Sequence, residues 1–337
     1  MNIAINGFGR IGRQVLRIIL EKHPELTVVL INDLSPNDIL GHLFQYDSVY
    51  RKYPGTVETN DKELIVDGKK IRMTAEKDPA ALPHKEMKVD IVLECTGVFR
   101  KREGAALHLK SGAKKVILSA PGKGEIDGTF CIGVNEDSYD SAKMDIISNA
   151  SCTTNCLAPM AKVLHDAFGI RQGFMTTIHS YTSSQKIVDG PDKDWRRARA
   201  AAINLIPTST GAAKAVGLVL PDLAGKLDGI AVRVPTPTGS LTDLTCVLGK
   251  EATAEAVNAA FKKAAEGPMK DILGYEEKPL VQQDYVGDPR SSIVDAAYTS
   301  VQTENGVTLC KTLAWYDNEW GYSNRLVELA KFIGKKL

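Results

Sequence analysis

The stretch Asn2-Ile3-Ala4-Ile5-Asn6-Gly7-Phe8-Gly9-Arg10-Ile11-Gly12 opens the chain and decides the class of its first domain. Its first five residues form a short apolar strand pattern, and helical spacing of apolar residues follows over Arg10 to Lys22. The three glycines between them fit G-x-G-x-x-G in the strand, turn and helix order that dinucleotide binding requires. One glycine serves the tight turn, one lets the backbone approach a pyrophosphate, and one allows close packing of helix and strand. The stretch therefore predicts a Rossmann-type domain.

An acidic residue follows the next strand at the offset that this fold uses for the ribose. The strand Thr27 to Asn32 ends at Asp33, about 20 positions after Gly12. A carboxylate there accepts hydrogen bonds from the ribose hydroxyls and repels a ribose phosphate, so the sequence favours NAD over NADP. The alternative is that Asp33 only caps a helix beginning near Ser35-Pro36.

The rest of the first half continues the alternation of strands and helices. Strands are predicted at Val89 to Glu94 and Lys115 to Ser119, with a helix at Arg102 to Ser111 between them. This rhythm is typical of a doubly wound parallel sheet, and Thr96 and Ser119 follow the carboxyl ends of two strands, where ligands bind. Each is nearly as well explained as an ordinary turn residue. We expect residues 56–73 to add short alternating strands at the sheet edge.

A cysteine stands where a strand pattern gives way to a helical one, in Ser148-Asn149-Ala150-Ser151-Cys152-Thr153-Thr154-Asn155-Cys156. In the first turn of a helix running to Phe168, Cys152 meets unpaired backbone N–H groups and the positive end of the helix dipole, which favour a thiolate. The alternative is that Cys152 and Cys156 are two small core residues on one helix face. His179, at the end of a predicted strand from Gly173, is the candidate partner for the thiolate, although a strand-end histidine can also be structural.

The second half also contains groups suited to anions. Residues 180–206 form a long polar segment in which Arg196, Arg197 and Arg199 either face solvent or a subunit, or supply a clamp on a phosphate. Thr210-Gly211 opens a helix over Ala212 to Val219, so hydroxyls and backbone N–H groups gather at a helix start. A strand over Leu227 to Val234 carries Arg233 toward the same region.

The last part of the chain predicts a mainly antiparallel sheet and a final helix. The turn Asn305-Gly306 joins two strands in a hairpin, and the amphipathic helix Trp320 to Ile333 is expected to pack on the first domain. The other predicted strands are Leu241 to Leu248, Ser292 to Ala296, Ser300 to Glu304 and Val307 to Trp315.

Composition excludes several classes of protein. With 43% hydrophobic and 25% charged residues in 337, the chain is long enough for two globular domains. Its 42 basic and 41 acidic side chains argue against a primary nucleic-acid or membrane partner. Six scattered cysteines and the absence of a basic, apolar leader favour a reducing, cytoplasmic location. No run reaches the roughly 20 apolar residues of a membrane span, and no spacing of histidine or cysteine predicts a metal site.

Four segments together identify a resemblance that covers essentially the whole chain. Asn-Gly-Phe-Gly-Arg-Ile-Gly, Ser-Asn-Ala-Ser-Cys-Thr-Thr-Asn-Cys, Arg-Val-Pro-Thr-Pro and Trp-Tyr-Asp-Asn-Glu-Trp-Gly-Tyr resemble the signatures of phosphorylating glyceraldehyde-3-phosphate dehydrogenases. The resemblance implies a Rossmann NAD-binding domain over 1–151, completed by a C-terminal helix over 316–337, and an α+β catalytic domain over 152–315. It implies oxidation of glyceraldehyde 3-phosphate with NAD through a thiohemiacetal and a thioester on Cys152, assisted by His179, and attack by inorganic phosphate.

The resemblance also implies roles for other residues. Thr182 and Arg233 would hold the substrate phosphate, Arg197 would serve one or both phosphates, and the attacking phosphate would meet Ser151, Thr153, Thr210 and Gly211. Residues expected to contact or position the cofactor are Gly7, Gly9, Arg10, Ile11, Gly12, Asp33, Lys77, Thr96, Ser119, Asn318 and Tyr322. Lys77 stands where many members have arginine.

Members of this family are commonly homotetramers, which is the assembly expected here. Two alternatives remain open from the sequence. One is an erythrose-4-phosphate dehydrogenase, which shares the cysteine and histidine but releases an acid by hydrolysis. The other is a non-catalytic binding or scaffold role, against which the presence of both Cys152 and His179 argues.

Overall fold

The computed structural model describes all 337 residues and divides them into two compact units. The first unit comprises residues 1–130, 136–150 and 323–337, and the second comprises 131–135 and 151–322. The C-terminal segment expected to complete the first domain, 316–337, is therefore shared, because 316–322 groups with the second unit. No helix in the chain combines the length and apolar character needed to cross a membrane.

A nine-stranded sheet forms the centre of the first unit. Its order is β10-β11-β9-β8-β1-β2-β7-β6-β5, with parallel pairing from β10 to β7 and antiparallel pairing in the last two strands. The strands are β1 (Asn2–Asn6), β2 (Thr27–Asn32), β5 (Val57–Thr59), β6 (Glu63–Val66), β7 (Lys69–Thr74), β8 (Ile91–Glu94), β9 (Lys115–Leu118), β10 (Gly128–Thr129) and β11 (Ile146–Ser148). The predicted parallel sheet with an edge insertion is confirmed.

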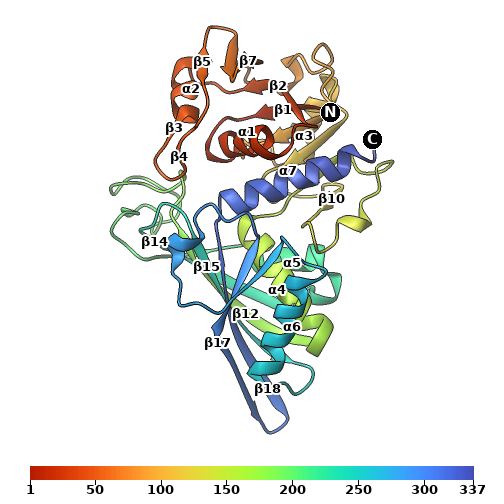
Figure 1. Cartoon of the computed structure of the whole chain (residues 1–337), viewed down its shortest axis with the longest axis vertical. Coiled ribbons are helices and arrows are strands. Elements are labelled where there is room, and N and C mark those ends of the chain that lie inside the picture. The colour runs from red at the N-terminus through yellow and green to blue at the C-terminus, as the bar shows by residue number, and fades with distance from the viewer. The chain divides into compact units, whose positions relative to one another are not determined.

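Four helices accompany this sheet, together with the two-stranded β3 (Tyr46–Asp47) and β4 (Arg51–Lys52). They are α1 (Arg10–Lys22), α2 (Asn37–Gln45), α3 (Arg102–Lys110) and α7 (Trp320–Gly334). Figure 1 shows α7, in blue, beside the N-terminal α1, and the hydroxyl of Ser323 lies 3.3 Å from Oε1 of Gln14. The expectation that the last helix packs on the first domain is thereby confirmed.

The second unit is built on a seven-stranded, mainly antiparallel sheet in the order β13-β14-β12-β15-β18-β17-β16. Only β12 with β14 and β16 with β17 pair in parallel. Its strands are β12 (Ile170–Ser180), β13 (Ile206–Ser209), β14 (Leu227–Val234), β15 (Ser240–Leu248), β16 (Leu273–Glu276), β17 (Ser292–Glu304) and β18 (Val307–Tyr316), and its helices are α4 (Cys152–Phe168), α5 (Ala212–Val219) and α6 (Ala254–Glu266).

Several elements differ from the sequence expectation. Ser292–Ala296 and Ser300–Glu304 are one strand, β17, whose pairing with β18 is interrupted between Asp295 and Ser300. The interruption explains why the alternating pattern breaks there without ending the strand. The short strand β13, directly before the predicted helix start at Thr210, was not anticipated, and neither were β16 and α6.

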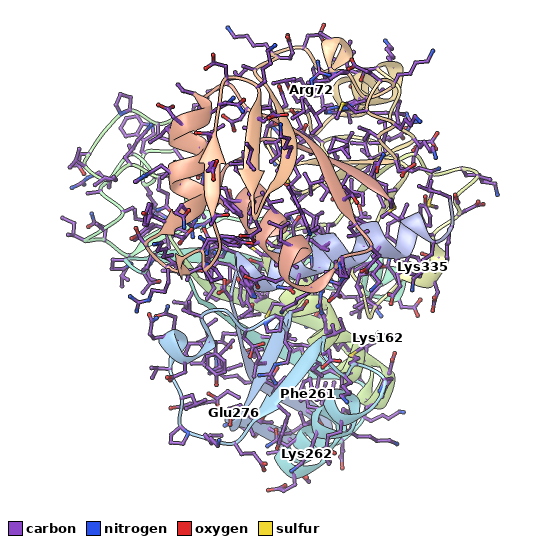
Figure 2. The ribbon with its side chains drawn as sticks, turned by 45° about the horizontal axis from the view of Figure 1, so that its top comes forward. Arg72, Lys162, Phe261, Lys262, Glu276 and Lys335 are labelled. Atoms are coloured by element: carbon purple, nitrogen blue, oxygen red, sulfur yellow. The ribbon has the colours of Figure 1, made fainter.

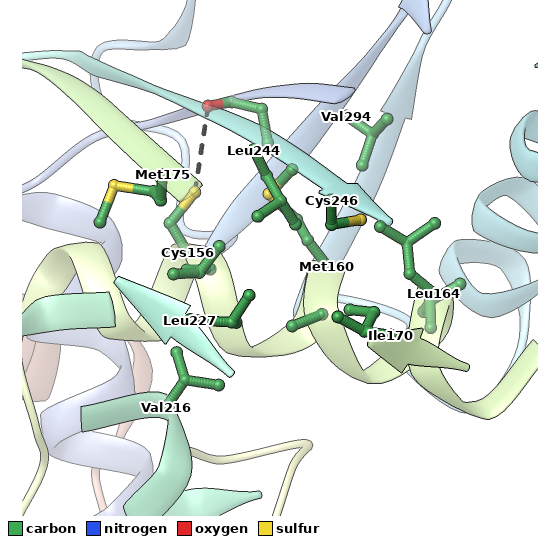
Figure 3. Close-up of a cluster of buried hydrophobic side chains, with 14 of the residues drawn as sticks. Cys156, Met160, Leu164, Ile170, Met175, Val216, Leu227, Leu244, Cys246 and Val294 are labelled. Carbon is green, nitrogen blue, oxygen red and sulfur yellow. Dashed lines mark hydrogen bonds between the residues drawn. The ribbon is translucent and has the colours of Figure 1, made fainter. Parts of the chain in front are cut away.

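Helix α4 is held against the sheet by an apolar cluster that fixes its start. Figure 3 shows Cys156, Met160 and Leu164 of this helix among side chains from β12, β14 and β15. Cys156 is fully buried there, and its thiol lies 3.9 Å from the carbonyl oxygen of Ala314. The interpretation of Cys156 as a packing residue is confirmed.

Helix α6 has one buried apolar face and one exposed polar face. Phe261 is buried in the apolar cluster, whereas its neighbour Lys262 is exposed and contacts Glu277 at 3.3 Å (Figure 2). An amphipathic helix of this kind is stabilised mainly by its buried face. The sheet and its helices therefore give α4 a rigid support.

Candidate active site

The turn before α4 places Cys152 at the first helical position. Ala150 has a positive φ of 55°, a conformation uncommon for a residue with a side chain. Ser151 follows in extended conformation, and its hydroxyl accepts a hydrogen bond from the backbone N–H of Thr154 at 3.0 Å. This cap satisfies one N–H group of the helix start, and Cys152 begins the first turn behind it.

The predicted pair is brought together within the second unit. Sγ of Cys152 lies 3.5 Å from Nε2 of His179, which is 4% exposed near the end of β12. Arg233 stands directly opposite His179 in the register of β14 with β12. Its Nη1 lies 2.7 Å from Nδ1 of His179 and donates to the carbonyl oxygen of Ser180 at 2.9 Å.

The Nδ1 atom of His179 has two competing partners. The carbonyl oxygen of Ser180 lies 2.7 Å away and would accept a proton from Nδ1, whereas Arg233 only donates. With the proton on Nδ1, Nε2 is free to accept a proton from Cys152. With Arg233 donating to Nδ1, Nε2 carries the proton and faces the sulfur as a donor. The arrangement supports both protonation patterns of a neutral imidazole.

Burial sets the ionisation of both members of the pair. It lowers the pKa of His179 to about 3, with the positive charge of Arg233 acting in the same direction. Burial also raises the pKa of the Cys152 thiol, while Arg233 and hydrogen bonds involving Thr153 oppose that shift. The net direction for Cys152 differs from the expectation drawn from its helix position, because loss of hydration outweighs the favourable charges around it. The pair is a neutral thiol beside a neutral imidazole.

Tyr316 connects the elements that carry the pair, and sequence reasoning did not assign it a role. Its hydroxyl lies 2.9 Å from Oγ1 of Thr153 on α4 and 2.8 Å from Oγ1 of Thr177 on β12. Its ring meets the ring of His179 edge to face, with centroids 6.1 Å apart. Burial raises its pKa, so the phenol stays neutral. The signal in the sequence that could have identified Tyr316 is its place inside the Trp-Tyr-Asp signature.

Two helix starts lie close together beside Cys152. The hydroxyl of Thr154 on α4 donates to the carbonyl oxygen of Ala212, the first residue of α5, at 3.2 Å. The hydroxyl of Thr210, one residue before the N-cap Gly211, accepts from the N–H of Ala212 at 3.2 Å, and the space above Gly211 is open. The structure therefore groups Ser151 with Thr210 and Gly211 at a site suited to an anion. Thr153 differs, because its hydroxyl is turned inward to Tyr316.

The remaining phosphate candidates lie in the segment after β12. Nε of Arg197 lies 3.5 Å from a carboxylate oxygen of Asp194. Burial is the largest cause that lowers the pKa of the Arg233 guanidinium, and the nearby positive charge of Arg197 lowers it further. Two neighbouring cations of this kind favour binding of an anion. Thr182 lies three residues after His179, with its hydroxyl 3.0 Å from that of Ser184.

In the first unit, the glycine loop fits a dinucleotide. Gly7 has φ of 93°, and an added Cβ would lie 2.7 Å from the backbone nitrogen of Thr96. A Cβ on Gly12 would lie 2.2 Å from the carbonyl oxygen of Gly7, whereas above Gly9 nothing stands within 4 Å. Two glycines thus allow close packing and the middle one leaves open space, as a pyrophosphate requires.

Asp33 and Thr96 are fixed beside this loop. The carboxylate of Asp33 accepts from the N–H groups of Phe8 at 2.8 Å and Ser35 at 2.9 Å. The alternative that Asp33 caps the next helix is wrong, because α2 begins at Asn37 with Pro36 as its N-cap. Thr96 donates both its N–H, at 2.8 Å, and its hydroxyl to Glu94. Ser119 follows β9, with its N–H donated to the carbonyl oxygen of Glu94 at 3.0 Å.

The other cofactor candidates differ in their surroundings. Arg10 forms an ion pair with Asp47 at 2.5 Å, Ile11 is half-buried, and Lys77 is exposed. In the second unit, Tyr322 is buried, and Oδ1 of Asn318 accepts from the N–H of Gly239 and the hydroxyl of Ser240, both at 3.0 Å.

Comparisons with known proteins agree over the whole length. The family described as "Glyceraldehyde 3-phosphate dehydrogenase, NAD binding domain" matches residues 1–102, and its "C-terminal domain" matches residues 151–318. The chain is 59% identical over 336 residues to glyceraldehyde-3-phosphate dehydrogenase 1 of Bacillus subtilis, covering 100% of this chain and 99% of the relative. The corresponding proteins of Priestia megaterium and Geobacillus stearothermophilus are 58% and 56% identical over the same shares.

Proposed function

The chain belongs to the glyceraldehyde-3-phosphate dehydrogenase family, and we propose that Cys152 and His179 carry out the oxidation and phosphorylation of glyceraldehyde 3-phosphate in its second unit. NAD is the cofactor, in keeping with the NAD-binding family match and with the glycine loop. The observation that carries the proposal is the 3.5 Å separation of Sγ of Cys152 and Nε2 of His179 at the start of α4.

The first step makes a bond between sulfur and the aldehyde carbon. Nε2 of His179 takes the proton of the Cys152 thiol while Nδ1 donates to the carbonyl oxygen of Ser180. The imidazolium so formed gives this proton to the aldehyde oxygen, and a thiohemiacetal results. Because the imidazole is neutral before the step, it has the capacity to accept this proton at neutral pH.

The second step turns the thiohemiacetal into a thioester. His179 removes the hydroxyl proton as the carbon loses a hydride, for which bound NAD supplies the acceptor. A phosphate oxygen then bonds to the acyl carbon, the carbon–sulfur bond breaks, and the acyl phosphate leaves a thiolate on Cys152. At this stage His179 and the Arg233 charge stabilise the negative sulfur.

Two sets of residues hold the two phosphates in this proposal. Thr182 and Arg233 hold the substrate phosphate, and Arg197 serves one or both sites. The attacking phosphate meets Ser151, Thr153, Thr210 and Gly211, which is supported by the contact between the starts of α4 and α5. For Thr153 only a backbone contribution agrees with the inward direction of its hydroxyl.

A phosphate-dependence assay tests the function. With glyceraldehyde 3-phosphate and NAD, absorbance of NADH should rise over many turnovers only when phosphate or arsenate is present. Equal multiple-turnover rates without either anion would instead indicate hydrolysis of the thioester, as in an erythrose-4-phosphate dehydrogenase. A protein with no turnover under any of these conditions would support the scaffold alternative.

We extend this proposal to the roles of the two units, the assembly of the protein and its location. The N-terminal unit binds the cofactor, the second unit is catalytic, and the chain acts as a cytoplasmic homotetramer. Large apolar side chains exposed in the second unit support burial between subunits: Phe174 at 75%, Trp195 at 90% and Ile203 at 81%. Light scattering should give a mass about four times that of the chain; a monomeric mass would contradict the tetramer.

A further inference from the structure

The buried hydroxyl of Ser240 joins Asn318 to the strand that carries His179. Ser240 is the first residue of β15 and only 2% exposed. Its oxygen accepts the backbone N–H of Ser180 at 3.2 Å, and its hydroxyl donates to Oδ1 of Asn318 at 3.0 Å. A hydroxyl has one proton to donate, so accepting from Ser180 leaves that proton for Asn318.

The Ser240 hydroxyl is one of three groups that set which way the Asn318 amide points; the Thr238 hydroxyl also lies 3.4 Å from Oδ1. Oδ1 receives both the Gly239 N–H and the Ser240 hydroxyl at 3.0 Å, and a hydrogen-bond donor at either place requires the oxygen there. The Nδ2 group makes no hydrogen bond with the protein. Its two hydrogens are therefore available only to an acceptor, such as a carbonyl or phosphate oxygen of a bound cofactor.

The same hydroxyl also reaches the backbone behind the catalytic imidazole. The peptide N–H that it accepts belongs to Ser180, whose carbonyl oxygen lies 2.7 Å from Nδ1 of His179. The Ser180 hydroxyl in turn donates to the carbonyl oxygen of Gly239 at 2.7 Å. Two hydrogen bonds thus tie Ser180 to residues 239–240, and two more tie those residues to Asn318.

We propose that Ser240 is a positioning residue: it holds the Asn318 amide with its hydrogens toward an oxygen of NAD, and it fixes the Ser180 backbone that orients His179. This rests on the proposed role of Asn318 in cofactor binding. Because the Ser240 hydroxyl is taken up by Ser180 and Asn318 and the residue is only 2% exposed, we expect its effect on NAD to pass through Asn318.

A double-mutant cycle on NAD affinity tests the proposal. NAD alone is titrated into cofactor-free wild-type enzyme and the variants Ser240→Ala, Asn318→Ala and the double variant, with binding followed by calorimetry. Loss of one orienting hydrogen bond, about 1 kcal/mol net, should raise the Kd of Ser240→Ala about fivefold. In the Asn318→Ala background the same change should alter Kd by less than about twofold, because the amide it orients is gone.

The possible results separate the role of Ser240 from the role of Asn318. A fivefold effect of Ser240→Ala that persists without Asn318 overturns the inference and leaves the role of Asn318 intact. An unchanged Kd in Asn318→Ala overturns the cofactor role of Asn318 and the inference with it, whereas phosphate-dependent turnover still tests the proposed function. An unchanged Kd in Ser240→Ala overturns the inference alone.

A matched control separates orientation from general loss of a buried hydroxyl. Thr312 on β18 is fully buried and its hydroxyl has no hydrogen-bond partner. Thr312→Val should leave the Kd for NAD within about twofold of wild type, and an equal fivefold loss there would overturn the inference. If Ser240→Ala does not fold, Ser240→Cys keeps the size of the side chain with a weaker donor and enters the same cycle.

Discussion

The two units each bury an imidazole cluster, and we propose that only the cluster in the second unit reacts. In the first unit, His84 contacts His108 at 3.0 Å, and His108 contacts Glu94 at 3.1 Å. Glu94 also accepts from Thr96 and from Asn6 at 2.5 Å. In the second unit, His179 faces the thiol of Cys152 and has competing partners at Nδ1.

Burial alone does not distinguish the two clusters. It lowers the pKa of His84 to about 4, with help from His108, and that of His179 to about 3. The difference lies in the proton positions. In the first cluster one set of proton positions suffices: His84 donates to His108, and His108 donates to Glu94. His179, in contrast, supports two sets of proton positions. A perturbed histidine marks a reactive site only when it has a nucleophile and a second protonation pattern.

The largest expected effect is loss of the nucleophile. Cys152→Ser keeps the size of the side chain but replaces the thiol by a hydroxyl that ionises far less readily. Turnover in the phosphate-dependent assay should fall by about 10⁴-fold or more. Unfolding in urea should change by less than about 1 kcal/mol, and turnover within tenfold of wild type would contradict the assigned role.

Loss of the catalytic imidazole should have the next largest effect. His179→Asn removes Nε2 beside the sulfur, so turnover should fall by about 10²- to 10⁴-fold. The matched change in the other cluster is His108→Asn, which should leave kcat at saturating NAD within about threefold. Equal losses of kcat in the two variants would show that the two clusters do not differ in function.

The order of the two histidines should reverse when the free energy of unfolding is measured in place of turnover, with the larger effect at His108. His108→Ala removes the hydrogen-bond partner of His84 Nε2 and one of the donors to the buried Glu94, which costs about 2 to 4 kcal/mol. We expect a urea midpoint well below that of the wild type, with the slope of the transition unchanged. A fully stable His108→Ala variant would contradict a structural role for the chain.

The lowered pKa values also predict how stability depends on pH. Between about pH 4 and 6.5 the unfolded imidazole of His84 binds a proton that the folded one does not, so stability falls as pH falls. From pH 7 to pH 5 the loss from this group is about 2 kcal/mol. Urea unfolding of His84→Gln at both pH values should show a loss smaller by that amount, and an identical loss would contradict the buried, neutral His84.

The smallest effect compares two helix caps. Ser151→Ala and Thr253→Ala remove side chains that accept from Thr154 and Ala256 at the starts of α4 and α6. Each should cost about 1 kcal/mol in urea unfolding. Only Ser151→Ala should also raise the KM for inorganic phosphate, and an equal rise in both variants would argue against a phosphate site at Ser151.

Much of the fold and the reacting pair could be predicted because the signals are local. The glycine spacing after β1 and the change from a strand to a helical pattern at Cys152 are readable in the sequence, and both elements begin where expected. The Glu94, His108 and His84 chain was not anticipated, because its contacts join residues far apart with no shared spacing. The same holds for Tyr316 and Ser240, whose partners lie far away in the sequence, on α4, on β12 and just before α7. The raised pKa of Cys152 was also missed, since desolvation depends on the packed surroundings rather than on helix position.

The division of the chain has a consequence for its synthesis. The second unit is complete once Tyr322 is made, but the first unit still lacks its final segment, Ser323–Leu337. The apolar face of that segment is fully buried at Leu326, Val327 and Leu329. Because domains generally fold as units, the first unit needs residues 323–337 to complete its core, although it begins at Met1, whereas the second unit needs no residue after Tyr322.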